Sequence, residues 1–214
     1  MLWENDSETR ISKDQKPKTI SQQLFRKSSI YDLKGTKMKR EVCILTKVSA
    51  EYAEKIKEYR QEFLFGGDSM DGCGSLRTIS DPYEYIQKCK DYESPETLPK
   101  DRVLATQFLF VRKNDNRLLG MIQVRHYFND YLSKFGGHIG YSIRPSERQR
   151  GYAKEMLKRV LPYCRELGLE RVLITCDENN IGSEKTILAN GGVYESTIYE
   201  SNENLYLKRY WIKL

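Results

Sequence analysis

The chain has 214 residues, of which 39% are hydrophobic and 31% charged, with a formal net charge of +6 and a mean hydropathy of -0.68. This length allows one well-formed core and is too short for two ordinary enzyme domains. No apolar stretch approaches the roughly 20 residues that a membrane-spanning helix requires, so we expect no membrane partner.

The cysteines and the first residues give expectations about the cellular compartment. Five cysteines are widely spread and include no C-x-x-C pair, so we expect neither a disulfide framework nor a metal site. The opening segment MLWENDSETR is acidic and has no apolar core, so we expect no secretory leader. Together these features favour a cytoplasmic protein.

The first half of the chain alternates between polar segments and short apolar elements. Residues 1–40 are lysine-rich without sustained periodicity, which predicts a flexible, basic N-terminal extension. A strand is expected at 43–48, followed by a helix at 50–65 for which Ser49 is a good N-cap residue. The glycine-rich segment GGDSMDGCGS, residues 66–75, predicts a loop of the kind that often lines sites. A second helix is expected at 82–89.

The second half begins with two β-runs, 106–113 and 117–128, which the hairpin signal NDN separates. A strand at 138–143, a helix from 153 to 167, a strand at 171–176 and a helix at 181–189 follow. Strands at 193–199 and 205–214 close the chain. A strand–helix–strand unit among antiparallel strands predicts an α/β fold with a mixed sheet, in one domain over 41–214.

The turn between the strand at 138–143 and the following helix has the composition of an anion site. A helix N-terminus leaves its first amides without partners and favours a phosphate. Gly151 lets the backbone approach a ligand, Ala153 keeps the helix start uncluttered, and Arg148 and Arg150 add permanent charge. The alternative is an ordinary basic surface turn.

The segment RQRGYA, Arg148 to Ala153, satisfies the pattern [QR]-x-x-G-x-[GA] at a strand-to-helix turn. Asn180 and Ser183 match a downstream Asn-x-x-[SA], and Gly191 follows at the expected spacing. In these features the chain resembles the GNAT superfamily of acyl-CoA-dependent N-acyltransferases, and more narrowly a bacterial branch of predicted acetyltransferases. The resemblance extends from about Cys43 to Leu214.

The resemblance implies a central, mostly antiparallel mixed sheet splayed between its fourth and fifth strands, with helices on both faces. The pantetheine arm of acetyl-CoA would lie in the gap, bound by backbone groups near Ile143 and by Asn180 and Ser183. The pyrophosphate site would be formed by Arg148, Gln149, Arg150, Gly151, Tyr152 and Ala153. The acetyl group would pass directly to a primary amine of a small molecule or an exposed amino group. Many members of the superfamily form dimers, so a homodimer is a candidate assembly for this chain.

The sequence identifies the general acid and base less clearly than it identifies the cofactor-binding residues. Many members carry a tyrosine seven residues after the motif asparagine, where this chain has Ile187. Ser183, Tyr141 and water are candidates to donate the proton to the thiolate in its place. Alternatively, the thiolate leaves without an acid. His138 and His126 are the two histidines of the chain and both are candidate bases, with His126 also a candidate for substrate binding; for both, a purely structural role is the alternative.

Two aspartates in the glycine-rich loop, Asp68 and Asp71, are candidates for binding a cationic amine, with plain solvation as the alternative. Two other functions compete with the enzyme hypothesis. One is a non-catalytic acyl-CoA-binding or sensing module, which the missing tyrosine favours. The other is nucleic-acid binding through the basic extension, which we place last because that segment has no recognised binding motif.

Overall fold

The computed structural model describes residues 30–31, 37–38 and 41–214, and the chain divides into two compact units, 1–40 and 41–214. In the first unit, β1 (Ile30–Tyr31) pairs antiparallel with β2 (Lys37–Met38). The predicted flexible, basic extension falls largely outside the described residues and stays a prediction.

The second unit contains every strand and helix that the sequence predicts between 43 and 214, with ends shifted by a few residues. Its strands are β3 (Cys43–Lys47), β4 (Ala105–Arg112), β5 (Arg117–Arg125), β6 (Ile139–Ile143), β7 (Arg171–Asp177), β8 (Gly192–Glu200) and β9 (Leu205–Lys213). Its helices are α1 (Ala53–Gly66), α2 (Pro82–Asp91), α3 (Tyr152–Glu166) and α4 (Ile181–Leu188). A π-helical turn, Leu132–Gly136, precedes β6.

The strands form two antiparallel sheets, with the orders β3-β4-β5-β6 and β7-β9-β8. The sheets touch where β6 begins: the His138 amide donates to the Leu173 carbonyl at 2.8 Å, and the Leu173 amide donates to His138 Nδ1 at 2.9 Å. No strand ladder within 41–214 joins β6 to β7 beyond this point. The predicted splay between the fourth and fifth strands of the domain is therefore confirmed.

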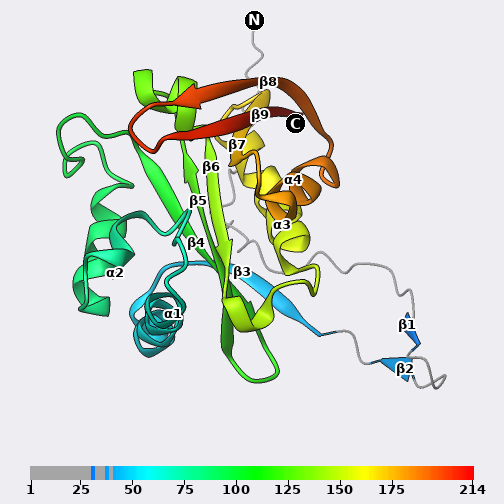
Figure 1. Ribbon diagram of the computed structural model, residues 1–214. Helices are drawn as coiled ribbons and strands as arrows, with labels where there is room; N and C mark the ends of the chain where they lie inside the picture. The colour runs from blue at the N-terminus through cyan, green and yellow to red at the C-terminus, as the bar shows by residue number, and fades with distance from the viewer. Residues whose placement is uncertain (1–29, 32–36, 39–40) are drawn as a thin grey trace, which may run out of the picture. The chain divides into compact units, whose positions relative to one another are not determined.

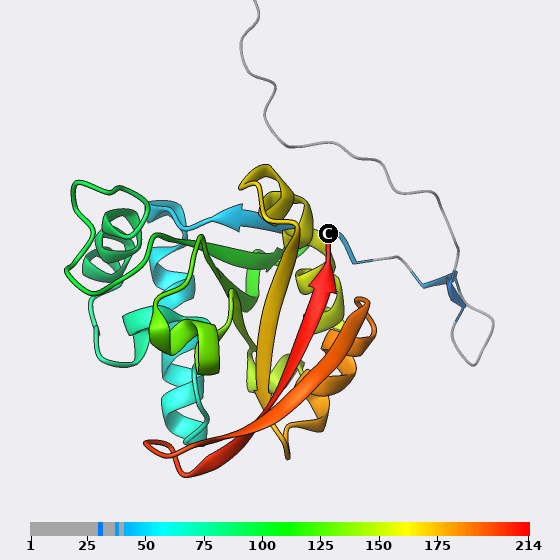
Figure 2. The ribbon, with the colours of Figure 1, turned by 90° about the horizontal axis from the view of Figure 1, so that it is seen from above.

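Helices cover both faces of this arrangement (Figures 1 and 2). Helices α1 and α2 lie on one side of the strands, and α3 and α4 lie on the other. Each side has its own buried cluster: α1 contributes Ile56, Tyr59 and Phe63, and α3 contributes Met156, Leu157, Val160, Leu161 and Cys164. Burying one such side chain stabilises the fold by about 1.5–3 kcal/mol. The apolar stripe of α3 thereby fixes its N-terminus near the end of β6.

Candidate active site

The turn before α3 has the backbone geometry that the sequence predicts for an anion site. Gly151 precedes the first residue of the helix with φ +80°, a left-handed conformation that favours glycine, and no side chain caps the helix. Among the described residues, no hydrogen bond uses the backbone amides of 149–154. A Cβ at Gly151 would have no neighbour within 4 Å. The turn thus presents free N–H groups to open space at the positive end of the helix dipole.

The two motif arginines are already paired with carboxylates. Arg148 Nη1 donates to Asp68 Oδ1 at 3.0 Å, and its Nε donates to the Ile143 carbonyl at 3.2 Å. Arg150 Nη1 donates to Glu147 Oε2 at 2.6 Å. Each guanidinium is about half exposed. The free amides therefore provide most of the unbalanced positive potential, while the arginines brace the turn.

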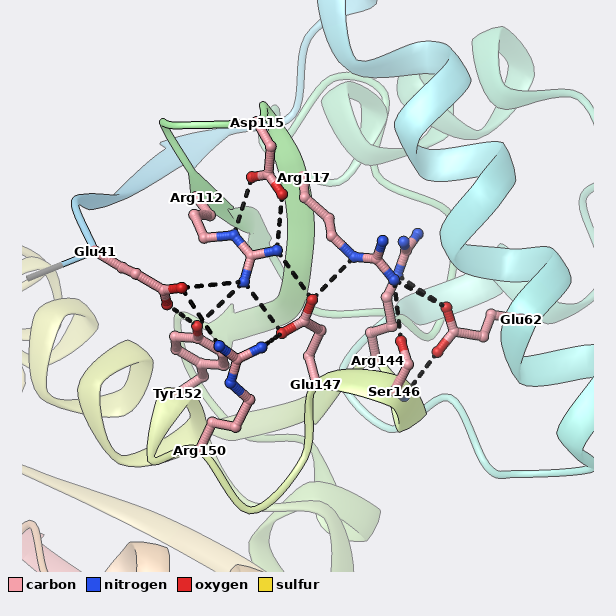
Figure 3. Close-up of polar contacts among 10 residues, drawn as sticks. All are labelled: Glu41, Glu62, Arg112, Asp115, Arg117, Arg144, Ser146, Glu147, Arg150 and Tyr152. Atoms are coloured by element: carbon pink, nitrogen blue, oxygen red, sulfur yellow. Dashed lines mark hydrogen bonds and ion pairs between the residues drawn. The ribbon is translucent and has the colours of Figure 1, made fainter. Parts of the chain in front are cut away.

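Beneath the turn lies an ion network whose centre is Glu147 (Figure 3). This side chain is 6% exposed, its carboxylate accepts from Arg112 and Arg150 at 2.6–3.2 Å, and it forms an ion pair with Arg117 Nε at 3.1 Å. Arg150 also donates to Glu41 at 3.3 Å. Because the network joins β4, β5 and the turn, it holds the loop of the proposed anion site at fixed distance from the sheet.

The same network reaches α1 through Glu62. Its carboxylate accepts from the backbone amide of Ser146 at 2.8 Å and lies 3.3 Å from Nε of the buried Arg144. The Arg144 guanidinium also stacks over the Tyr59 ring, 5.7 Å from its centroid. The ion pairs of this cluster, drawn in Figure 3, join four arginines, Arg112, Arg117, Arg144 and Arg150, to the four carboxylates of Glu41, Glu62, Asp115 and Glu147, so its charges balance.

The edge of β6 that faces the gap carries backbone groups without a partner among the described residues. Arg144 N–H donates to Leu119 O, and His138 O accepts from Arg125 N–H, so even-numbered residues of β6 bond to β5. In an antiparallel ladder the alternate residues point the other way. Tyr141 and Ile143 therefore present their N–H groups to the gap, where an extended ligand could bond to them.

Tyr141 and Ser183 meet across this gap. The Tyr141 hydroxyl lies 2.9 Å from Ser183 Oγ, and thereby links β6 to α4. Burial raises the pKa of Tyr141 above its ordinary value, so the phenol keeps its proton. Asn180 caps α4 by accepting from the Ser183 amide at 3.0 Å, which leaves its own side-chain NH₂ without an acceptor among the described residues.

His138 has a structural partner on each side. It is 5% exposed, its ring centroid lies 3.9 Å from that of Phe128, and its Nδ1 accepts from the Leu173 amide. Burial, with help from the positive charge of Arg125, lowers its pKa to about 4. The ring is therefore neutral near pH 7, with its proton on Nε2 and the Nδ1 lone pair in use. These contacts fit the structural alternative better than the role of a general base.

The other predicted acceptor-side residues do not form one cluster. His126 Nε2 lies 3.0 Å from Thr106 Oγ1, which in turn contacts Tyr163 of α3, and burial lowers the pKa of this histidine. Asp68 is bonded to Arg148, beside the turn. Asp71 is exposed and accepts from the Ser69 hydroxyl at 3.0 Å. Of these three, Asp71 is the side chain left open to a ligand.

The glycine-rich loop is seated directly on β6. A Cβ at Gly72 would lie 2.1 Å from the carbonyl of Gly140, so this approach requires glycine. The buried Gln107 donates from Nε2 to the Gly72 carbonyl at 2.9 Å and fixes the loop. Asp71 is thereby held at the strand that borders the gap.

A family model described as an acetyltransferase (GNAT) domain matches residues 46–193, more than half of the chain. The chain belongs to the GNAT acetyltransferase family. The resemblance drawn from RQRGYA, Asn180 and Ser183 is confirmed, and with it the predicted fold.

Individual relatives agree with this assignment. The uncharacterized N-acetyltransferase YnaD of Bacillus subtilis (strain 168) is 28% identical over 104 residues, which cover 46% of this chain and 59% of that protein, less than two thirds of its length. The crystal structure of ribosomal-protein-S5-alanine acetyltransferase from Vibrio fischeri matches 82% of this chain and 95% of its own, with a TM-score of 0.61 at 17% identity. The structure of yncA from Salmonella typhimurium, solved with acetyl-CoA, matches 80% and 94%, with a TM-score of 0.55 at 13% identity. At these identities the structural likeness shows the fold.

The GNAT site has features that acetyl-CoA fits. The free amides before α3 suit its pyrophosphate, and the gap-facing edge of β6 suits its extended arm. Among the described residues, no group of three or more His, Cys, Asp or Glu side chains could hold a metal ion. In the part of the chain that the structure describes, no helix is long and apolar enough to cross a membrane.

Two positions bear on catalysis in this GNAT protein. Ile187, at the place of the usual tyrosine, is fully buried, and its side chain would lie 2.4 Å from a Cβ at Gly192. Burial raises the pKa of the Cys176 thiol to about 11, so this thiol is a poor nucleophile. Ile187 therefore cannot donate a proton and Cys176 is not suited to attack the thioester, while Tyr141 places a phenol at the gap.

The sequence reasoning missed Glu147, Glu41, Gln107 and Arg125. Glu147 immediately precedes the motif RQRGYA, and a carboxylate next to arginines was the available signal. The other three act through contacts with residues distant in sequence, and no local pattern marks them.

Proposed function

We propose that this GNAT protein is an N-acetyltransferase that moves the acetyl group of acetyl-CoA directly to a primary amine of a small molecule or an exposed amino group, in the cytoplasm. The observation that carries the proposal is the uncapped start of α3 at Gly151, beside a strand edge with free amides. All five cysteines are free and buried, which supports a reducing compartment.

The donor side follows from the backbone. The amides of 150–153 would hold the pyrophosphate, and Tyr141 and Ile143 N–H would bond to the pantetheine arm. Asn180 would donate its free NH₂ to the arm near the thioester. Acetyl-CoA supplies an activated acetyl group whose C–S bond to the thiol breaks as the amide bond to the acceptor nitrogen forms.

The reaction also requires proton transfers, to which side chains of the protein contribute. Tyr141 keeps a proton at its phenolic oxygen and, with Ser183 as neighbour, can release it toward the departing thiolate. The amine must lose a proton before it attacks, and the neutral His138 has no free lone pair on Nδ1 to take it. Water therefore removes this proton, with Asp71 at the loop to hold the amine as a cation until it reacts.

Calorimetric titration with acetyl-CoA tests the donor site. Gly151→Asp places a carboxylate at the free amides, whereas Gly151→Asn has the same shape and tolerates the same left-handed backbone. We expect micromolar binding by the wild type, similar binding by the Asn variant, and at least tenfold weaker binding by the Asp variant. Equal affinities for Asp and Asn, or no binding by folded wild-type protein, would contradict the proposal.

Release of free thiol in the presence of amines separates the enzyme from an acyl-CoA sensor. The Vibrio fischeri structural relative is named for an alanine of ribosomal protein S5, so the panel includes peptide N-termini as well as small amines. Transfer to any amine supports the enzyme. Tight binding of intact acetyl-CoA without transfer would support the sensing module instead.

A further inference from the structure

Arg125 lies at the end of β5, on the sheet face that the glycine-rich loop covers. A Cβ at Gly140 would lie 3.1 Å from Gly72 Cα and 3.4 Å from Arg125 Nη2. The guanidinium and the loop therefore meet on the same side of β6. Asp71, next to Gly72, is close enough to favour the charged form of Arg125 electrostatically.

Only Nη1 of the Arg125 guanidinium donates hydrogen bonds to the described residues. Its Nη1 donates to the carbonyls of Gly136 and Gly137 at 2.8 and 3.2 Å. Nε and Nη2 make no hydrogen bond, and no carboxylate of the described residues forms an ion pair with the group. Burial lowers its pKa, but an arginine stays protonated at physiological pH. The site thus contains a partly buried cation with which no carboxylate of the described residues forms an ion pair.

Arg209 provides a comparison, because it also donates to carbonyls of the π-helical turn but, unlike Arg125, forms an ion pair. Its Nη1 donates to the carbonyl of Ser133 at 2.9 Å and to that of Lys134, on the same turn. Its Nε, however, pairs with Glu195 at 2.5 Å. One arginine at the turn is therefore neutralised within the fold, and the other is not.

The free atoms of Arg125 also define a geometry. Nε and Nη2 form one edge of the planar group, and two parallel N–H bonds from such an edge match the two oxygens of a carboxylate. Asp71, the exposed acid at the same loop, offers the opposite charge for an ammonium group.

We propose that Arg125 binds a carboxylate of the acceptor, so that the preferred substrate is an amine that also carries a carboxylate. This inference rests on the proposed function, because it names the class of amine that the same site accepts. The carboxylate has two sources: the α-carboxylate of a free amino acid, or an acidic side chain near a peptide N-terminus.

The test compares matched acceptors. Free L-amino acids are assayed against their carboxamides, and peptide amides with Glu at the second position against those with Gln. Each pair differs in one negative charge. We expect the wild type to prefer the carboxylate member of at least one kind of pair by tenfold or more in kcat/KM, and the kind of pair shows the source.

The variants Arg125→Gln, Arg125→Lys and Arg209→Gln then assign the preference. Arg125→Gln should reduce the ratio to about one, Arg125→Lys should keep part of it, and Arg209→Gln should retain it. Affinity for acetyl-CoA should be unchanged in all three, which separates this inference from the donor site. Transfer to amines without any preference for a carboxylate, or a preference that survives in Arg125→Gln, would overturn it. Absence of binding to acetyl-CoA would refute the proposed function instead, and the inference with it.

Discussion

The hydroxyl of Tyr141 on β6 lies 2.9 Å from that of Ser183 on α4 and forms a side-chain bridge across the gap between the two sheets. Since the pKa of Tyr141 is raised by burial, the bridge holds a proton at neutral pH. Tyr141→Phe keeps the ring and removes this proton. We expect kcat to fall roughly 100-fold, within the usual range for loss of a general acid, with KM for acetyl-CoA nearly unchanged.

Tyr199→Phe is the control, because this hydroxyl bonds to Asn204 at 2.7 Å on the β8–β9 hairpin. Its kcat should stay within twofold of the wild type. If Tyr141→Phe raised KM for acetyl-CoA and left kcat intact, the tyrosine would serve binding and another group, or water, would protonate the thiolate.

The network at Glu147 predicts a stability effect. Glu147→Gln removes one negative charge that neutralises three arginines, two of them close to the sheet. Breaking a buried ion pair from one side costs about 3–5 kcal/mol because the remaining charges stay uncompensated. We expect the free energy of unfolding, from urea denaturation, to fall by about 3 kcal/mol, and the affinity for acetyl-CoA to weaken as the turn loosens.

Asp115→Asn provides the comparison for this network. Asp115 accepts from the same Arg112, at 2.7 and 2.9 Å, but its side chain is 46% exposed. Solvent-exposed pairs contribute about 0–1 kcal/mol, so this variant should lose less than about 1 kcal/mol. Equal losses in the two variants would show that burial of Glu147 does not set its importance.

The packing of the glycine-rich loop on β6 can be tested by substituting each of two glycines in turn. Gly72 and Gly67 have nearly the same φ, +70° and +69°. Alanine at either position brings the strain of a left-handed backbone, about 1–2 kcal/mol. At Gly72 the new Cβ also meets the Gly140 carbonyl at 2.1 Å, whereas at Gly67 nothing lies within 4 Å.

Gly72→Ala should therefore destabilise the protein by about 1–3 kcal/mol more than Gly67→Ala, the usual cost of overpacking. Thermal denaturation measures the difference. We expect a higher KM for the amine in Gly72→Ala as the loop lifts from β6. Similar melting temperatures for the two variants would mean that the loop is free to move away from the strand.

The fold could be predicted, and a candidate donor site located, because their signals are local. The period of the apolar residues marks each strand and helix, and RQRGYA places a glycine and free amides at one turn. These features depend on neighbours within a few residues. The order of the elements then leaves few ways to arrange the sheet.

The acceptor side could not be predicted, because there the outcome depends on which face of the sheet a residue occupies. Arg125 and His126 are adjacent, and successive side chains of a strand point to opposite faces. The sequence singles out the histidine, but the arginine is the one beside the glycine-rich loop, while His126 contacts Thr106 toward α3. The long-range packing of Gly72 on Gly140 determines which of the two side chains lies beside the loop.

His138 predicts a pH dependence of stability rather than of catalysis. Its pKa is about 4 in the folded protein, against an ordinary value of about 6.5, because burial disfavours the charged ring. The unfolded chain therefore binds the proton more readily. The stability that the neutral ring contributes is complete above pH 6.5 and is lost as the pH falls from 6.5 to 4. The shift corresponds to about 3 kcal/mol over that window.

His138→Asn isolates this contribution, because an amide oxygen can replace Nδ1 as acceptor for the Leu173 amide and does not titrate. Urea denaturation at pH 7.5 and pH 4.5 should show a smaller loss of stability in the variant than in the wild type, by about 2–3 kcal/mol. The carboxylates titrate in both proteins and cancel in the comparison. Equal losses would mean that His138 is accessible to protons in the folded state, and its role as a general base would then have to be considered again.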